Sequence, residues 1–248
     1  MALEPRQRTI SMGAGVDSRA GVDEGLRRYM LRVYNYMTLG LALTGVVAFA
    51  VANTPALLQL FYAQTAVGIQ PTILAYIAMF SPLAFVLVLS FGINKLSTPA
   101  VQALFWAFAA VMGLSLTHIF IVYTGASIAR VFFITASMFA AMSLYGYTTK
   151  KDLSGWGSFL LMGLIGVIIA MVVNIFLQSA MMEFVISIIG VLVFVGFTAY
   201  DTQRIKSEYN VNDSGAITEK RAVYGALSLY LDFINIFLFL LHLFGSRE

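Results

Sequence analysis

Residues 222–244 read AVYGALSLYLDFINIFLFLLHLF, and this stretch decides the fold class of the chain. At about 1.5 Å per residue, a helix of this length crosses the hydrocarbon of a bilayer, yet Asp232 lies near its middle. A carboxylate at that depth costs at least roughly 2.5–3.5 kcal/mol, so it normally has a partner or a function. A helix would place on one face the polar residues Ser228, Asp232, Asn235 and His242. We interpret this stripe either as interhelical hydrogen bonding or as the wall of an ion or proton path.

The composition is that of a membrane protein. Of 248 residues, 60% are hydrophobic and 11% charged, whereas a soluble domain carries about a quarter charged residues. The chain has no cysteine, which excludes disulfides and thiolate metal sites. Its two histidines fall in different apolar segments, so we expect no structural zinc site and no cofactor. We attribute the net charge of +3 to membrane topology and expect no nucleic-acid partner.

Seven apolar segments of membrane-spanning length follow one another along the chain. They are Val33–Val51, Ile73–Phe91, Val101–Tyr123, Ile128–Tyr147, Trp156–Leu177, Phe184–Tyr200 and Ala222–Phe244. The sequence therefore predicts an all-α polytopic protein in which residues 33–248 form a domain of seven transmembrane helices. The polar residues 1–32 lack the features of a secretory signal, and we expect them to form a mostly disordered cytoplasmic tail.

The basic residues predict the orientation of these helices. With seven crossings, thirteen of the fifteen Lys and Arg residues fall on the side of the N-terminus, and only Arg130 and Arg247 on the other. Because basic residues are enriched in cytoplasmic loops, we predict a cytoplasmic N-terminus and a C-terminus outside.

A second acidic residue, Asp201, ends the sixth segment in the sequence GFTAYDTQRIK. It lies about one helical turn from Thr198 and from Arg204. Asp232 lies about 15 Å inside the predicted start of its own helix. The two aspartates can meet only if the sixth helix ends below the membrane surface, or if a cavity opens inward to that depth. Otherwise Asp201 is a helix-end carboxylate paired with Arg204, and Asp232 a buried carboxyl that donates a structural hydrogen bond.

If the aspartates do meet, their chemistry is specific. Two carboxylates in a poorly solvated place repel each other, so they hold one proton between them. Separation, a cation, or a nearby Arg204 or Lys206 would relieve the doubly charged state. Together with Asn235, Thr198, backbone carbonyls and water, the pair could form a weak and incomplete calcium site. His118 of the third segment is interpreted as a helix–helix hydrogen bond or, alternatively, as part of a proton relay.

Two known classes of membrane protein share features with these segments, the retinal proteins and the intramembrane aspartyl proteases. A retinal protein needs a lysine within a span, and none of the seven segments contains one. Intramembrane aspartyl proteases place two aspartates on adjacent helices, one of them in a Tyr-Asp pair, which Tyr200–Asp201 matches. Their second aspartate follows Gly-x-Gly, whereas Leu229–Tyr230–Leu231 precedes Asp232 here. The protease therefore stays a remote alternative, and we expect no enzymatic activity.

Three stretches resemble a known family. They are YDTQRI at Tyr200–Ile205, ALSLYLDFINIFLFLL at Ala226–Leu241 and SPLAFVLVLSFGINKLS at Ser81–Ser97. With them, the chain from Tyr29 onward is similar to bacterial members of the transmembrane Bax-inhibitor-motif family. The resemblance implies seven helices, of which one is central and surrounded by the others.

The resemblance also implies a function. It points to a pH-sensitive calcium leak governed by two aspartates on the last two spans, which match Asp201 and Asp232. A basic residue on the second span has been proposed to latch one of these aspartates. Ile73–Phe91 has no basic residue, and Lys95 lies beyond it, so the latch is missing from its expected place.

Two functional hypotheses follow. The first is a pH-sensitive calcium leak of the bacterial inner membrane, with calcium and protons as its ions and with protonation of Asp201 and Asp232 favouring the closed state. The second, implied by bacterial relatives of the resembled family, is a non-conducting regulator of a membrane-bound ATP-dependent protease. In that case deleting Met1–Asp23 should abolish the role while sparing any flux.

Overall fold

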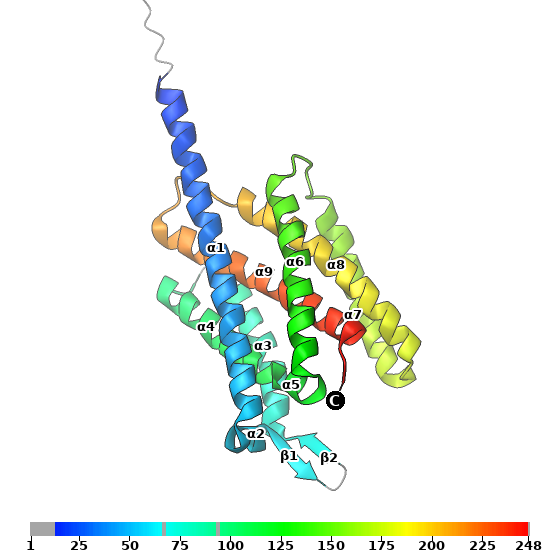
Figure 1. Ribbon diagram of the computed structural model, residues 1–248. Coiled ribbons are helices and arrows are strands. Elements are labelled where there is room, and N and C mark those ends of the chain that lie inside the picture. Colours follow the sequence, from blue (N-terminus) through cyan, green and yellow to red (C-terminus); the bar gives the residue numbers. More distant parts are fainter. Residues whose placement is uncertain (1–12, 66–67, 93–94, 248) are drawn as a thin grey trace, which may run out of the picture.

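The computed structural model describes residues 13–65, 68–92 and 95–247, with side chains from Glu24 onward. Its long helices form a bundle, with a small hairpin at one end (Figure 1). The elements, in order, are α1 (Gly13–Asn53), α2 (Pro55–Phe61), β1 (Tyr62–Thr65), β2 (Gly68–Pro71), α3 (Ile73–Gly92), α4 (Thr98–Ser115), the 3-10 turn η1 (Leu116–His118), α5 (Ile119–Val122), α6 (Gly125–Thr148), α7 (Trp156–Leu177), α8 (Ala180–Ser207) and α9 (Gly215–Phe244).

Within the described part of the chain, seven helical segments are long and apolar enough to cross a membrane. Six of them lie in α1, α3, α6, α7, α8 and α9, and the seventh is the continuous run Thr98–Val122. The predicted all-α fold with seven spanning helices is therefore confirmed.

Helix α9 is the central helix. It contacts α1, α4, α6 and α8, and in Figure 1 it passes between them. Its apolar residues from Ala222 to Leu241 are buried on nearly every side, and the aromatic ring of Tyr230 is completely enclosed. By contrast, most side chains of α7 are exposed, as expected for a helix whose outer face meets lipid. The central position implied by the family resemblance is thus confirmed.

Two helices begin earlier than predicted. Helix α1 starts at Gly13, twenty residues before Val33, so residues 13–32 of the predicted tail are helical. Residues 1–12 lie outside the described part. Helix α9 starts at Gly215 rather than at Ala222, because Ser214 caps it by accepting a hydrogen bond from the backbone N–H of Ile217. Both extensions carry polar residues, which a search for apolar segments does not detect.

The connection between the first two spans, for which the sequence predicted no structure, contains a short helix and two strands. Here the antiparallel strands β1 and β2 pair Tyr62 with Pro71 and Thr65 with Gly68. The strands are short and largely exposed, and they lie beyond the ends of α1 and α3 (Figure 1).

Helices α6 and α8 approach each other closely at Gly146. A Cβ atom built on this glycine would lie 2.2 Å from the backbone oxygen of Ala199. Two helices can come this close only where one of them lacks a side chain, which is the general use of small residues in membrane bundles. Because Ala199 is two residues before Asp201, this contact helps to fix the position of the acidic end of α8.

Candidate functional site

The antiparallel register of α8 and α9 brings Asp201 and Asp232 to the same level of the bundle. On one side of the pair, Arg204 hydrogen-bonds Ser228, and Ile205 packs against Gly225. Both aspartates are buried, with 7% and 5% of their surface exposed, and Arg204, which pairs with Asp201, also bonds Ser228, one turn before Asp232. The predicted pair therefore shares one buried site between the last two helices.

This register removes the geometric obstacle raised by the sequence. Measured from Ala222, Asp232 lies too deep to meet a residue at the end of the sixth helix. Helix α9, however, extends back to Gly215, so its first turns reach beyond Ser207, where α8 ends. Helix α8 in turn continues past Asp201 to Ser207, so both aspartates lie inside their helices, within the paired part of α8 and α9.

Arg204 is the cation of the site. Its Nη2 lies 3.2 Å from Oδ1 of Asp201 and donates a 3.1 Å hydrogen bond to the hydroxyl of Ser228. Its Nε lies 3.8 Å from a carboxylate oxygen of Glu208, one turn further along α8. The guanidinium also lies over the ring of Tyr200, 5.8 Å from its centroid. Arg204 therefore joins α8 to α9 at the level of the two aspartates.

The carboxyl group of Asp232 is incompletely satisfied. Among the described residues, its Oδ2 has no hydrogen-bond partner although the atom is fully buried. The Nε of Arg204 is likewise buried without a hydrogen bond in this part of the chain. An unpaired polar atom of this kind costs about 1–3 kcal/mol, and more when it is charged. Such a cost is typical of a group kept for a function rather than for stability.

The other predicted polar residues bond to their own helices. The hydroxyl of Thr198 donates to the carbonyl of Phe194, and the amide of Asn235 donates to the carbonyl of Leu231. Nδ1 of His118 lies 2.9 Å from the carbonyl of Ser115. Among the described residues, His118 thus forms neither the predicted interhelical bond nor a link to the aspartates. Of the supporting residues named from the sequence, only Arg204 and Ser228 contact the pair or its ion-pair partner.

The aspartates alone do not make a metal centre. No group of three or more His, Asp or Glu side chains that could hold a metal ion occurs in the described residues. Calcium takes six to eight oxygen ligands. A calcium ion at Asp201 and Asp232 would therefore need water or backbone oxygens for most of its coordination, which fits transient contact with a passing ion.

Two polar clusters, one beside the site and one further toward the start of α9, were not found from the sequence. In the first, a chain of hydroxyl contacts links three helices: Tyr34 to Ser143 at 2.6 Å, and Ser143 to Thr202 at 3.1 Å. Thr202 follows Asp201 directly, so this chain reaches the edge of the acidic pair. Hydroxyls scattered over three helices carry no periodic signal that would have connected them.

The second cluster is centred on Glu219, in the early part of α9. Its carboxylate accepts hydrogen bonds from Tyr36 at 2.6 Å and from Gln102 at 2.9 Å, and it pairs with Arg32. The cluster ties α1 and α4 to the central helix. Glu219 precedes the predicted segment Ala222–Phe244; the signal that could have placed it on a helix is the N-cap residue Ser214, followed by a run without helix breakers.

A bundle of seven spanning helices, with a carboxylate pair buried between its last two, defines the class of polytopic membrane proteins that carry ionisable groups at membrane depth. Comparison with known proteins identifies the family more closely. The family model described as "Inhibitor of apoptosis-promoting Bax1" matches residues 26–248. The chain belongs to this Bax inhibitor family, and the resemblance inferred from the sequence is confirmed.

Several relatives are similar over nearly their whole length. The inner membrane protein YbhL of Escherichia coli strain K12 is 48% identical over 227 residues, which are 90% of this chain and 94% of YbhL. The uncharacterized protein RP147 of Rickettsia prowazekii is 48% identical over 226 residues, covering 91% of this chain and 92% of the relative. An uncharacterized membrane protein of Streptococcus pyogenes, SpyM3_0260, is 36% identical over 230 residues.

Proposed function

We propose that this protein is a pH-sensitive calcium leak of the bacterial inner membrane, opened and closed by the protonation of Asp201 and Asp232. The observation that carries the proposal is the burial of both carboxyl groups at one level of the bundle, with a single guanidinium beside them. The name of the relative YbhL, an inner membrane protein, supports the location. We propose an N-terminus in the cytoplasm, as the basic residues indicate.

The closed state is proposed to carry one proton on the two aspartates. Arg204 can balance the charge of Asp201, from which it lies 3.2 Å away. Asp232 has a buried oxygen without a hydrogen bond, and a second charge there would lie in a poorly solvated place near the first. One proton on the pair removes this repulsion and leaves the site with no excess charge from the aspartates and Arg204.

The open state follows from removal of that proton. As pH rises, the pair becomes doubly negative, and either separation of α8 from α9 or entry of a cation relieves the repulsion. The other charged and titratable groups around Arg204 are Glu208 and Tyr200 on α8, Tyr224 on α9, Tyr29 on α1, and Lys150, Lys151 and Asp152, which line a pocket with Arg204. Among the described residues neither lysine pairs with Asp201 or Asp232, so a calcium ion is the counter-charge that the proposal supplies. Flux should therefore increase from acidic to alkaline pH.

Calcium flux into proteoliposomes, measured with a trapped fluorescent indicator across a pH series, tests the proposal. The wild-type protein should show a flux that rises with pH. Asp201→Asn combined with Asp232→Asn should make the remaining flux independent of pH, because no carboxylate is left to titrate.

Asp152→Asn is the matched control, since it removes a carboxylate from an exposed loop outside the membrane. Hydrogen bonds from the hydroxyl and the backbone N–H of Ser154 lower the pKa of Asp152, so this group stays charged throughout a series near neutrality. A pH-dependent flux that survives the double aspartate variant would refute the proposal. If the wild type conducts no calcium at any pH, the non-conducting regulator of a membrane-bound protease becomes the better hypothesis.

A further inference from the structure

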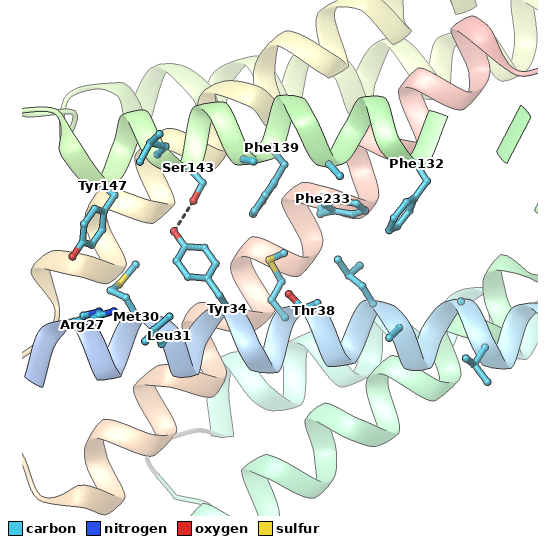
Figure 2. A pocket seen from close by; sticks show the side chains of 18 residues that line it. Arg27, Met30, Leu31, Tyr34, Thr38, Phe132, Phe139, Ser143, Tyr147 and Phe233 are labelled. Atoms are coloured by element: carbon cyan, nitrogen blue, oxygen red, sulfur yellow. Dashed lines mark hydrogen bonds between the residues drawn. The ribbon is translucent and has the colours of Figure 1, made fainter. Parts of the chain in front are cut away.

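A groove opens on the side of the bundle between α1 and α6. It has a volume of about 1050 Å³ and an almost wholly apolar lining. One wall is the face of α1 that carries Met30 and Met37, the other is the face of α6 that carries Phe139, and Phe233 of α9 forms the floor (Figure 2). The groove lies along helices whose neighbouring surfaces are apolar and exposed, so in a membrane it faces lipid.

One end of the groove is polar. There Arg27 of α1 and Tyr147 of α6 line opposite sides of its mouth (Figure 2). Neighbouring arginines on α1 have acidic partners: Arg28 pairs with Glu24, and Arg32 with Glu219. Arg27, in contrast, has neither an ion pair nor a hydrogen bond with any of the described residues. A cation that forms no ion pair within the described part of the chain, although its charge reaches Glu24 one turn away, therefore marks the entrance of an apolar groove.

The dimensions of the groove fit one leaflet of a bilayer. From Arg27 to Met37 the helix rises by about 15 Å, which is half of a hydrocarbon core of about 30 Å. An acyl chain that enters at Arg27 can therefore follow α1 down to Phe233 and the middle of the membrane. The charge at the mouth complements a phosphate, and Arg is well suited to bind one.

The walls of the groove favour an acyl chain over a protein helix. The hydroxyl of Tyr34 on α1 lies 2.6 Å from the hydroxyl of Ser143 on α6, so the two walls are bridged part of the way along (Figure 2). A helix about 10–12 Å wide would have to break this bridge to lie between the walls. A flexible acyl chain can pass beside it.

We propose that this groove is a binding site for an anionic phospholipid, with one acyl chain along α1 and α6 and the phosphate at Arg27. The site contains neither aspartate, although Tyr34 and Ser143 of its walls connect through Thr202 to the edge of the acidic pair, and it does not depend on calcium conduction. Its specificity comes from two elements, an apolar channel for the chain and a guanidinium for the headgroup.

Photo-crosslinking in liposomes tests the site. The probes are phosphatidylglycerol and phosphatidylcholine that carry the same diazirine-labelled acyl chain, and the labelled peptides are identified by mass spectrometry. With phosphatidylglycerol, peptides of α1 and α6 should be labelled several-fold more than those of α7, which reports lipid that merely surrounds the protein. Phosphatidylcholine should give a smaller excess, because Arg27 does not attract its zwitterionic headgroup to the same degree.

Two matched pairs of variants separate the headgroup contact from the chain contact. Arg27→Gln should reduce the preference for phosphatidylglycerol several-fold, whereas Arg28→Gln should not, because Arg28 is paired with Glu24. Ala140→Phe should fill the groove and reduce labelling by both probes. Ala141→Phe is its control, because Ala141 is also exposed on α6 but does not line the groove.

Three results would overturn the proposal. The first is labelling of α1 and α6 no stronger than that of α7, which means surrounding lipid only. The second is an equal response to Arg27→Gln and Arg28→Gln. The third comes from a benzophenone amino acid placed at Ala140 in native membranes: crosslinking to a second copy of the chain or to another protein, instead of to lipid, would assign the groove to a different occupant.

Discussion

Replacing Gly146 by alanine would test the close contact between α6 and α8 that positions the acidic end of α8. The added Cβ would lie 2.2 Å from the backbone oxygen of Ala199 and 2.9 Å from its Cα. An ordinary van der Waals contact of a Cβ begins near 3.4 Å, so the two helices must separate by about 1 Å. The obstacle is backbone, and no rotation of a side chain can relieve it.

The expected cost follows from this geometry. Overpacking in a tight core costs about 1–3 kcal/mol, and we expect the upper end because two helices must move together. For a chain of this size, each kcal/mol corresponds to about 2–4 °C, so the midpoint of thermal unfolding should fall by about 6–12 °C. Because Ala199 is two residues from Asp201, the calcium flux of the variant should also lose part of its dependence on pH.

The assay is thermal unfolding of the purified protein in detergent, at the same heating rate for each variant. Gly166→Ala is the control: it is an exposed helical glycine of α7, and nothing lies within 4 Å of its added Cβ. This substitution should leave stability unchanged or raise it by about 0.5–1 kcal/mol, because alanine favours helix. A Gly146→Ala protein that unfolds at or above the wild-type temperature would refute the close packing of α6 against α8.

Three further predictions concern the site and the topology. Arg204→Gln removes the ion pair with Asp201 and should destabilise the fold by only about 1 kcal/mol, since a third of the Arg204 side chain is exposed. Calcium flux through this variant should begin only at a more alkaline pH than in the wild type, because the aspartate pair then holds its proton more firmly. An unchanged dependence of flux on pH would contradict this role of Arg204. Glu219→Ala should lower the unfolding midpoint more than Glu219→Gln, because glutamine can still accept the hydrogen bonds of Tyr36 and Gln102; equal losses would argue against the hydrogen-bonded cluster. Since the chain has no cysteine, Ser154→Cys and Gln64→Cys each introduce a single thiol. If the N-terminus is cytoplasmic, Gln64 lies outside and Ser154 inside, so on intact cells an impermeant maleimide should label only Gln64→Cys.

The main outline of the fold was predictable because it depends on composition. In lipid a backbone must satisfy its own hydrogen bonds, so each long apolar run becomes a helix. The polar extensions of α1 and α9 were missed for the same reason: residues 215–221 are polar, and a cap at Ser214 rather than hydrophobicity decides where α9 begins. The hairpin of residues 62–71 was missed because its strands are short and largely exposed.

The site was predictable in its members but not in its geometry. A carboxylate in the middle of an apolar run identified Asp232, and the family resemblance added the pairing with Asp201. The register of α8 against α9 depends on close contacts such as that of Ile205 with Gly225, which no single-sequence pattern specifies. The bond from Arg204 to Ser228 follows from that register. Polar residues whose bonds stay within their own helix, as for Thr198 and Asn235, cannot be distinguished by sequence from residues that line a path.

The central place of α9 has a consequence for how the protein is made. Ribosomes deliver the helices in chain order, so all six other spanning helices, including α1, α4, α6 and α8 that contact α9, enter the membrane before the central helix does. Until α9 is inserted, the helix faces that later cover it have no central helix to pack against. A chain that ends before residue 222 would lack this packing altogether.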